Sequence, residues 1–222
     1  MPTARSGPQS PPVSLRAVQR EYDALAGRYD QRWARYVAAS TALADARLVL
    51  RPGMRVLDVG CGTGVLLAQL RARMPGARFL GVDATPGMLA RARERLGPDV
   101  PLVESSGEAL PLPDRSVDAV VSTSVLHYMA DAPQALREMH RVLAPGGTLV
   151  IVDWCADFIT MRALDVVLRV VDRAHERTYA ADAVRTLAAG ANFERIEITR
   201  CKIDRFWGLF ALTARVPMSR AS

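Results

Sequence analysis

Cysteine and histidine are scarce in this sequence. Its 222 residues include three cysteines, Cys61, Cys155 and Cys201, and three histidines. The cysteines are odd in number and far apart, and none belongs to a C-x-x-C pair, so we expect reduced thiols rather than a disulfide framework. Because the histidines are not clustered either, the sequence predicts no metal site.

Long apolar runs are also missing. No segment reaches the roughly 20 consecutive apolar residues that a membrane-spanning helix needs. The opening residues, MPTARSGPQSPPVS, lack the apolar centre of a signal peptide. We therefore expect no membrane span and a cytoplasmic protein. Half of the residues are apolar, which is enough for one sizeable core and predicts one globular domain.

Positive charge is present but not concentrated. The formal net charge is +6. Residues 1–53 hold eight basic against four acidic residues, 54–152 hold ten against ten, and 153–222 hold eleven against nine. The excess lies mainly in the N-terminal segment and forms no basic stripe. We therefore expect no nucleic-acid partner.

The first fifty residues divide into an arm and a helical segment. Four prolines among the first twelve residues predict a disordered or extended arm over 1–14. Apolar residues then recur at helical spacing within 15–50, which predicts two amphipathic helices. The first repeat consists of Val18, Tyr22, Leu25 and Tyr29, and the second of Trp33, Tyr36, Val37, Ser40 and Ala44.

From residue 54 onward, short apolar runs alternate with helical stretches, a pattern typical of a parallel sheet covered on both faces. Gly146 and Gly147 are expected to turn the chain from helix to strand. The expected strands are 54–59, 78–82, 101–103, 117–122 and 148–152. The expected helices are 64–74, 85–96, 131–143, 158–174 and 181–189.

The C-terminal part offers two more strands, 193–203 and 206–216. They lie too close together for a crossover helix and are expected to pair as an antiparallel hairpin. We therefore predict an α/β fold with a doubly wound, mainly parallel sheet and a C-terminal antiparallel strand. One domain over 15–222 would contain lid helices at 15–50, a core at 54–153, substrate-side helices at 154–190 and the hairpin at 193–216.

A glycine-rich turn, GCGTG, follows the first core strand at 60–64. The dinucleotide fingerprint needs a third glycine where this sequence has Val65, and a Walker loop needs G-K-[ST]. Neither phosphate-binding template fits. Asp58, just before the turn, would repel a phosphate and would suit a ligand that carries an ammonium group. The turn therefore indicates a cofactor that contains a nucleoside but no phosphate.

Four ordered segments carry a family resemblance. VLDVGCGTG resembles motif I of the class I S-adenosylmethionine-dependent methyltransferases, and GVDATPGMLARAR resembles motif II. GEALPLPDRSVDAVVSTSVLHYM and LREMHRVLAPGGTLVIVDW resemble the third and fourth signature regions of the methyltransferase type 11 branch. The resemblance covers 54–153. It implies a Rossmann-like fold with S-adenosylmethionine as cofactor, S-adenosylhomocysteine as product and no metal.

The resemblance also assigns the cofactor contacts. Asp58 would lie near the ammonium group, and Asp83 would accept both ribose hydroxyls, although a helix N-cap is the structural alternative for Asp83. Met88 would lie against the adenine, with core packing as its alternative. The residues expected to bind the cofactor are Tyr29, Asp58, Gly60, Cys61, Gly62, Gly64, Asp83, Ala84, Met88, Ser106, Gly107, Glu108 and Thr123.

One position departs from the family pattern. Family members often carry an acidic residue two places before Glu108, where it bonds the adenine amino group, and this sequence has Ser106 there. Ser106, Gly107 or the backbone of Glu108 is expected to take that role.

The implied reaction is in-line displacement of a methyl group from a sulfonium. The protein would align the acceptor, exclude water and, for some acceptors, remove a proton. His127, Asp153 and His175 are the candidate bases, and a histidine suits the role because its ordinary pKa is about 6.5. Structural hydrogen bonding is the alternative for each of them.

Aromatic residues gather on either side of the core segment, where a lid would close over the carboxyl ends of the strands. REYDALAGRYDQRW resembles the Tyr-Asp entry helix of quinone-type and small-molecule methyltransferases, so Tyr29 is expected at the site, with simple helix packing as its alternative. Arg32, Arg35 and Arg162 would suit an acidic acceptor but also fit an ordinary surface. The residues expected to contact the acceptor are Tyr22, Trp33, Tyr36, Tyr128, Trp154 and Tyr179.

The sequence favours methyl transfer to a small-molecule or lipid-like acceptor. A noncatalytic or regulatory module that keeps the cofactor site is the alternative, because glycines and Asp83 report binding rather than turnover. A nucleic-acid methyltransferase is less favoured, since STSVLHY does not match the [ND]-P-P-[YFW] of amino-base modifiers. The acceptor, the atom that is methylated and the oligomeric state, monomer or dimer, stay open.

Overall fold

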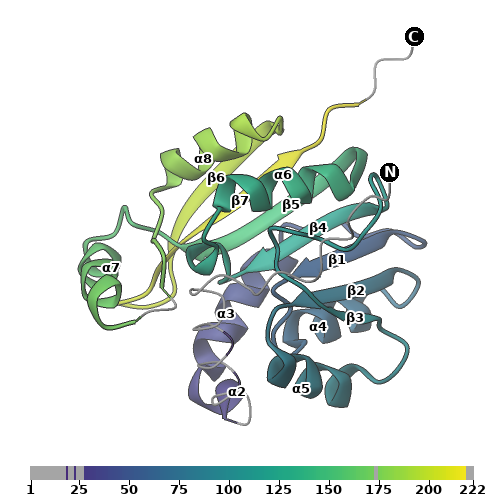
Figure 1. Cartoon of the computed structure of the whole chain (residues 1–222), viewed down its shortest axis with the longest axis horizontal. Helices are drawn as coiled ribbons and strands as arrows, with labels where there is room; N and C mark the ends of the chain where they lie inside the picture. The colour runs from purple at the N-terminus through teal and green to yellow at the C-terminus, as the bar shows by residue number, and fades with distance from the viewer. Residues whose placement is uncertain (1–18, 20–22, 24–27, 173–174, 219–222) are drawn as a thin grey trace, which may run out of the picture.

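A computed structural model describes residues 19, 23, 28–172 and 175–218. The expected arm over 1–14 and most of the first predicted helix, Tyr22 included, lie outside the described residues. A seven-stranded sheet has the order β3-β2-β1-β4-β5-β7-β6 (Figure 1). Its strands are β1 (Arg55–Val59), β2 (Arg78–Asp83), β3 (Leu102–Glu104), β4 (Val117–Thr123), β5 (Leu143–Trp154), β6 (Glu194–Lys202) and β7 (Gly208–Arg215).

Strands β1 to β5 pair in parallel, and β7 runs antiparallel to both of its neighbours, β5 and β6. The predicted mainly parallel, doubly wound sheet with an antiparallel C-terminal strand is therefore confirmed. The hairpin continues the sheet beyond β5. Its second strand, β7, pairs with β5, and its first strand, β6, forms the edge of the sheet.

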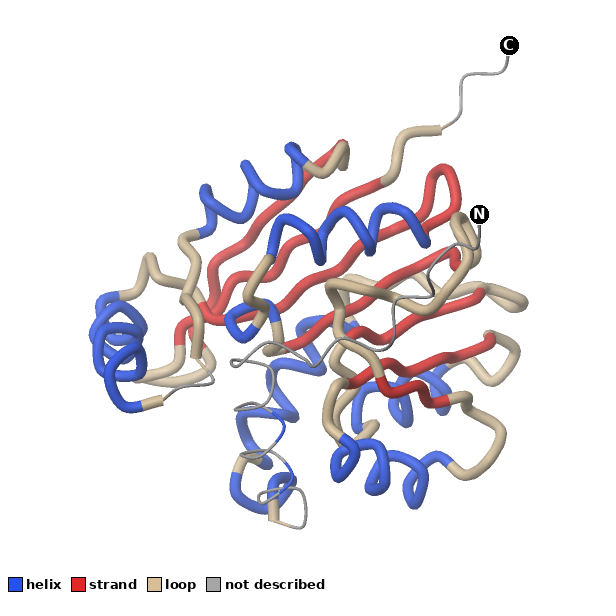
Figure 2. The backbone as a smooth tube through the Cα atoms, in the orientation of Figure 1, coloured by secondary structure: helices blue, strands red, loops and turns tan. Residues whose placement is uncertain are grey.

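Helices cover both faces of the sheet (Figures 1 and 2). Helices α6 and α8 lie on one face, and α3, α4 and α5 lie on the other. The helices are α2 (Tyr29–Arg32), α3 (Ala34–Asp45), α4 (Val65–Arg73), α5 (Pro86–Leu96), α6 (Ala132–Val142), α7 (Ile159–Val171) and α8 (Ala181–Gly190), with a 3-10 turn η1 (Leu126–Tyr128). Within the described ranges, no helix is long and apolar enough to cross a membrane.

Burial on both faces explains why the strands read as continuous apolar runs. In β5, Leu149 packs into the core beneath α6 and α8, whereas its neighbour Val150 packs into the core beneath α3 and α4. Val120 and Val121 divide in the same way in β4. Successive side chains of a strand point to opposite faces, so a strand between two helical layers needs an apolar residue at every position.

The start of β5 differs from the prediction. We expected this strand to begin at 148 after a glycine turn, but β5 begins at Leu143, which pairs with Val117. The register then shifts by three residues before Ala119 pairs with Thr148, so Gly146 and Gly147 lie in an irregular segment between the two paired parts of the strand. Gly146 has the expected positive φ, +75°, whereas Gly147 does not.

Two helix starts illustrate how local sequence fixes the elements. The Asp131 side chain accepts a hydrogen bond from the Gln134 backbone N–H at 2.9 Å and caps α6. Pro86 occupies the first turn of α5, where a missing N–H costs nothing. Both starts lie next to the carboxyl ends of strands, so they also shape the surface where loops meet.

Leu136→Ala tests the core beneath α6. Leu136 is fully buried in α6, so its truncation removes packing and leaves a cavity. We expect the free energy of unfolding, measured by urea denaturation, to fall by about 2–5 kcal/mol. Val49→Ala is the matched control because Val49 is exposed, and it should change stability by less than about 0.5 kcal/mol. Equal effects of the two substitutions would contradict this core.

Candidate functional site

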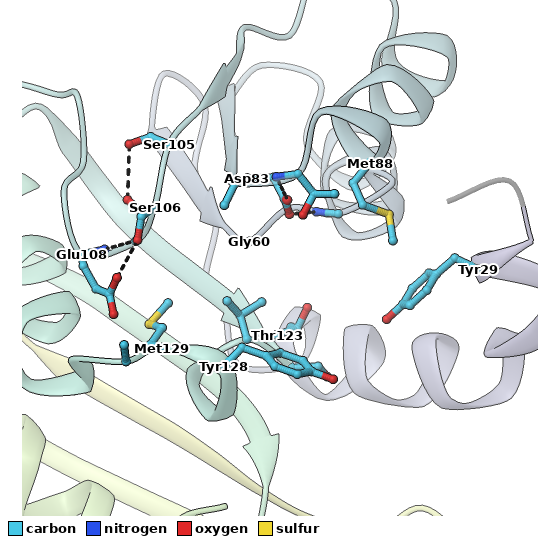
Figure 3. Close-up of a pocket in the computed structure, with 17 residues that line it drawn as sticks. Tyr29, Gly60, Asp83, Met88, Ser105, Ser106, Glu108, Thr123, Tyr128 and Met129 are labelled. Atoms are coloured by element: carbon cyan, nitrogen blue, oxygen red, sulfur yellow. Dashed lines mark hydrogen bonds between the residues drawn. The ribbon is translucent and has the colours of Figure 1, made fainter. Parts of the chain in front are cut away.

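A hollow that we call the main hollow, because most of the residues expected to bind the cofactor line it, follows the carboxyl ends of β3, β2, β1 and β4. It contains about 860 Å³ of empty space, and Figure 3 shows Tyr29 and Tyr128 pointing toward one another across it. Parallel sheets place ligand sites at this edge, where the strand order reverses beside β1. Ten of the residues expected to bind the cofactor line it: Tyr29, Gly60, Gly62, Asp83, Ala84, Met88, Ser106, Gly107, Glu108 and Thr123.

The glycine turn lies against the end of β2. The Gly60 N–H donates to the Val82 carbonyl at 2.7 Å. Gly60 has φ +74°, and a Cβ at this position would collide with the side chain of Val125. Glycine is therefore required at Gly60 both for its backbone angle and for the close approach of the η1 loop.

Gly64 was expected to contact the cofactor, but the structure places it where α4 packs against α5. It lies outside both hollows described in this section, in the turn just before α4, with φ +77°. A Cβ on Gly64 would lie 2.9 Å from Cδ1 of Leu96. Its missing side chain therefore allows α4 and α5 to pack closely.

Asp83 joins the glycine turn to the start of α5. Its Oδ2 accepts the Gly62 N–H at 2.8 Å, and its Oδ1 accepts the Thr85 N–H at 2.8 Å. Burial raises the pKa of Asp83, and these two hydrogen bonds oppose the rise. The N-cap of α5 is Thr85 rather than Asp83. Each carboxylate oxygen has further acceptor capacity toward the hollow.

Asp58 lies in a second, smaller hollow of about 420 Å³ that shares Gly60, Gly62 and Thr123 with the main one. Cys61 lines the same hollow. The Asp58 side chain is buried, and its Oδ1 has no hydrogen-bond partner among the described residues. Burial, with a smaller effect of Asp83, raises the pKa of Asp58 to about 8. A buried carboxyl oxygen without a donor favours a ligand that brings one, above all a cation.

Side chains of Gln19 and Asp30, before the core, contact the residues around the glycine turn and the start of α5. Asp30 accepts a hydrogen bond from the Thr63 hydroxyl at 2.7 Å and forms an ion pair with Arg95 at 2.6 Å. The Gln19 side chain donates to the Ala84 carbonyl at 2.7 Å. Burial, with smaller effects of Asp30 and Asp83, raises the pKa of Tyr29 to about 12. The segment therefore covers the glycine turn and places Tyr29 against the hollow.

Ser106 and Glu108 bond to each other at the far side of the main hollow (Figure 3). The Ser106 hydroxyl donates to Glu108 Oε2 at 2.8 Å, and the Asp131 N–H donates to Glu108 Oε1 at 2.7 Å. The Glu108 carboxylate is therefore engaged at the start of α6. A Cβ on Gly107 would lie 2.7 Å from Met129 Cε, so the backbone packs tightly here.

His127 and Asp153 form a buried pair behind Tyr128. His127 Nδ1 lies 2.5 Å from Asp153 Oδ1, and Asp153 also accepts the backbone N–H groups of His127 at 3.2 Å and Trp154 at 2.6 Å. A carboxylate that accepts these bonds fixes the proton on Nδ1 and leaves Nε2 as an acceptor. His127 Nε2 has no hydrogen-bond partner within the described residues. The imidazole stacks on Trp154, with ring centroids 4.0 Å apart.

A second buried pair lies beside the first. His175 Nε2 is 2.8 Å from Asp165 Oδ1, which also accepts the Thr178 N–H at 2.6 Å. The ring centroids of His175 and His127 are 5.8 Å apart. Burial lowers the pKa of His175, although its bond to Asp165 opposes this effect. All three candidate bases are therefore brought together, but none of them lines the main hollow.

The aromatic residues divide into two groups. Tyr36 accepts a hydrogen bond from Trp154 Nε1 at 2.8 Å, and its hydroxyl lies 2.6 Å from Ser124 Oγ. Trp33 packs edge-on against Tyr36 at 6.4 Å. Tyr179 instead pairs with Cys155 through an isolated parallel β-bridge of the backbone. Its side chain packs on the core beneath α6 and α8 and lines neither hollow.

Comparison with known proteins identifies the family. Residues 57–151 match the methyltransferase domain family. A demethylmenaquinone methyltransferase of Corynebacterium kroppenstedtii is 33% identical over 185 residues, which cover 77% of this chain and 79% of the relative. The chain belongs to the methyltransferase domain family.

Further likenesses to methyltransferases differ in extent. A demethylmenaquinone methyltransferase of Thermus thermophilus is 42% identical over 128 residues, 56% of this chain, and the match spans only 55% of that relative. The solved phosphoethanolamine N-methyltransferase 2 of Haemonchus contortus, in complex with S-adenosyl-L-methionine, gives a TM-score of 0.77 at 16% identity. That likeness covers 96% of this chain and 62% of the other and shows a shared fold.

Sequence patterns missed several residues of this methyltransferase that line the hollows or pack against the residues that line them. Ser124 lines the main hollow with φ +60°, an angle that a serine pattern does not reveal. Trp207 packs against Tyr36 with ring centroids 5.0 Å apart, and its only signal was an aromatic residue at a hairpin turn. Asp30 was readable from the Tyr-Asp pair of the entry helix. Within the described ranges, no group of three His, Cys, Asp or Glu side chains is arranged to hold a metal ion.

Asp58→Asn should change how stability depends on pH. The pKa of Asp58 is raised in the folded state to about 8, against about 3.9 in the unfolded chain. The unfolded state therefore releases this proton first, and the wild type loses stability as pH rises from 4 to 8. We expect the stability difference, variant minus wild type, to grow over that range and to level off above it.

The measurement is urea denaturation of the protein without ligand at a series of pH values. Asp99→Asn is the control, because the Asp99 side chain is 78% exposed and water solvates its charge in both states. A difference that stays constant from pH 4 to 8 for Asp58→Asn would contradict the proposed state of this carboxyl.

Proposed function

We propose that the chain transfers a methyl group from S-adenosylmethionine to a small-molecule or lipid-like acceptor. The observation that carries this proposal is the buried Asp58 carboxyl beside the glycine turn, whose Oδ1 has no partner in the part of the chain that the structure describes. An ammonium group would supply the missing donor and lower the raised pKa of Asp58. A phosphate has no proton to donate to this oxygen at neutral pH, and the ionised form of Asp58 would repel it.

The residues present fit the remaining parts of this cofactor. Asp83 would accept the ribose hydroxyls, because its two oxygens face the main hollow at the end of β2. Ala84 and Met88 would line the adenine, and Ser106 with the backbone at Gly107 would meet its amino group. Bound there, the cofactor would supply a sulfonium methyl group that an acceptor can attack in line, with S-adenosylhomocysteine as the leaving group. The proposal includes no metal.

We assign the role of general base to His127. Asp153 holds the His127 ring with its proton on Nδ1, so the buried Nε2 keeps a lone pair without a partner among the described residues. His127 does not line the main hollow itself, so the acceptor would reach Nε2 past the neighbouring Tyr128, which does. The proton of the acceptor would pass to Nε2 as the acceptor atom bonds to carbon. Asp153 is then a positioning residue, because its oxygens already hold His127 and the start of the following loop. His175 is held in turn by Asp165.

An acceptor with an apolar ring suits this site. Tyr29 and Tyr128 face each other across the main hollow, and Tyr36, Trp154 and Trp207 stand behind it. The two demethylmenaquinone methyltransferases described above are named for a quinone acceptor. A demethylated naphthoquinone, reduced to its hydroquinone so that the ring is nucleophilic, is therefore the first acceptor to test. The N-terminal helices and 154–190 would select the acceptor, within one domain over 15–222.

Asp83→Ala should weaken cofactor binding without unfolding the protein. It removes the acceptor for the ribose hydroxyls, together with the acceptor for the Gly62 and Thr85 N–H groups that shape the turn, at a cost of about 1–3 kcal/mol in binding free energy. Calorimetric titration with S-adenosylmethionine, S-adenosylhomocysteine and NADH measures the effect. The wild type should bind the two sulfur compounds and not NADH. Unchanged affinity in a folded Asp83→Ala protein would remove Asp83 from the site, and binding of NADH alone would end the proposal.

His127→Gln should separate catalysis from cofactor binding. We expect kcat to fall by about 10²–10⁴-fold, with unchanged affinity for S-adenosylhomocysteine. The assay measures S-adenosylhomocysteine production with the naphthoquinone acceptor, in the presence of EDTA. His140→Gln is the matched control, because His140 lies on α6 against Phe193, and it should keep full activity. A wild type that binds cofactor but turns over no acceptor would favour the noncatalytic alternative.

A further inference from the structure

The outer face of α7 is apolar and faces solvent. The exposed fractions of its aliphatic side chains run from 54% for Val167 to 84% for Val170. They recur at spacings of three and four residues, which places them on one side of the helix. The stripe, called here the α7 stripe, consists of Ile159, Val166, Val167, Val170 and Val171.

The opposite face of α7 is anchored, so the helix cannot turn its stripe inward. Met161 is fully buried in the core beneath α3 and α4. The buried Asp165 is bonded to His175 and to the Thr178 backbone. Rotating the helix would expose Met161 and break these bonds. The exposure of the stripe is therefore fixed by the packing of the other face.

The turn between β6 and β7 extends the apolar surface. The Thr160 hydroxyl donates to the Phe206 carbonyl at 2.6 Å, which places this turn beside the start of α7. The Phe206 side chain is 43% exposed. The α7 stripe and the exposed Phe206 therefore lie at the same end of the molecule, where the turn between β6 and β7 reaches the start of α7 (Figure 1).

Positive charges border this surface. The exposed charged residues within α7 are Arg162 and Arg169. Arg169 forms an ion pair at 2.7 Å with the one acidic residue of the helix, the buried Asp165, so Arg162 carries the unbalanced charge of α7. The turn adds exposed Lys202 and Arg205. The carboxylate of Asp204, in the same turn, accepts the backbone N–H groups of Phe206 and Trp207 at 2.8 Å each. The border is therefore complementary to an anionic surface.

We propose that the α7 stripe and Phe206 dock this protein on the surface of an anionic lipid bilayer. An amphipathic helix with an aliphatic face and arginines at its edge is the usual form of a helix that lies in the headgroup region. The centres of protein interfaces are instead richer in Trp, Tyr and Arg, and valine is under-represented among their dominant residues. Thirteen residues of α7 are too few to span a bilayer, so the helix lies on it.

Docking would place the acceptor side of the molecule against the membrane. Helix α7 follows β5 directly, and its Asp165 holds His175 beside His127. A lipid-like acceptor could then pass from the bilayer to the site without crossing water. This purpose rests on the proposed methyl transfer, whereas docking itself does not.

Vesicle flotation of the full chain tests the proposal. One set of vesicles is phosphatidylcholine alone, and the other is an equimolar mixture with phosphatidylglycerol. We expect binding to the anionic vesicles that weakens as salt is added. Val166→Ser with Val170→Ser should reduce binding by about tenfold or more, since two exposed aliphatic side chains lose their contact with lipid. Val49→Ser is the matched control, because Val49 is equally exposed at 67% but far from α7 in the sequence.

The charge is tested separately. Arg162→Gln should weaken binding to anionic vesicles, whereas Arg137→Gln, at an exposed position on α6, should not. Absence of vesicle binding, or binding that the two valine substitutions leave unchanged, would overturn the proposal. So would concentration-dependent dimerisation in sedimentation velocity that these substitutions abolish, because the stripe would then be the interface with a second copy of the chain.

Cofactor titration separates this proposal from the proposed function. The doubly substituted Val166→Ser, Val170→Ser protein should bind S-adenosylhomocysteine as the wild type does, which also shows that it is folded. If the wild type binds vesicles but no sulfur compound, docking stands and methyl transfer fails. If it binds the sulfur compound but no vesicles, docking fails and methyl transfer stands.

Discussion

The carboxylate of Asp83 is the contact on which the site depends. It accepts one N–H from the glycine turn at Gly62 and one from Thr85 at the start of α5. Three elements, the end of β2, the turn after β1 and the first turn of α5, are fixed relative to one another by a single side chain. Burial makes this carboxylate costly, and the two N–H groups offset part of that cost. The same oxygens remain accessible to a ligand in the main hollow.

The second buried carboxyl, Asp58, shows the opposite arrangement. It lies on the neighbouring strand and lacks the donors that Asp83 has. Its raised pKa follows from burial beside another acid. Folding therefore makes the ionised form of Asp58 unfavourable in the smaller hollow. A site that stores such a penalty gains binding energy from any ligand that relieves it. Asp83 therefore connects the elements of the site through its hydrogen bonds. Asp58 keeps a carboxyl oxygen without a partner among the described residues.

Much of this could be predicted because the sequence signals are local. The alternation of apolar runs predicted the strands of a doubly wound sheet, and the fold is confirmed. The glycine turn and Asp83 could be placed at the same sheet edge because parallel strands present their carboxyl ends together. The predicted start of β5 at 148 was wrong, because the pairing of Leu143 with Val117 depends on a neighbouring strand and leaves no local signal in the sequence. The cofactor and acceptor contacts stay predictions.

By itself, the sequence determined the element order, the apolar faces and the residue types at the strand ends, because these follow from periodicity and backbone preference. Tertiary structure decided which distant groups meet. Nothing local links His127 to Asp153, Asp165 to His175 or Tyr36 to Trp154, since each pair is joined across separate elements. The same holds for α7. Its sequence shows two apolar sides, and only the burial of Met161 and Asp165 decides that the valine side faces outward.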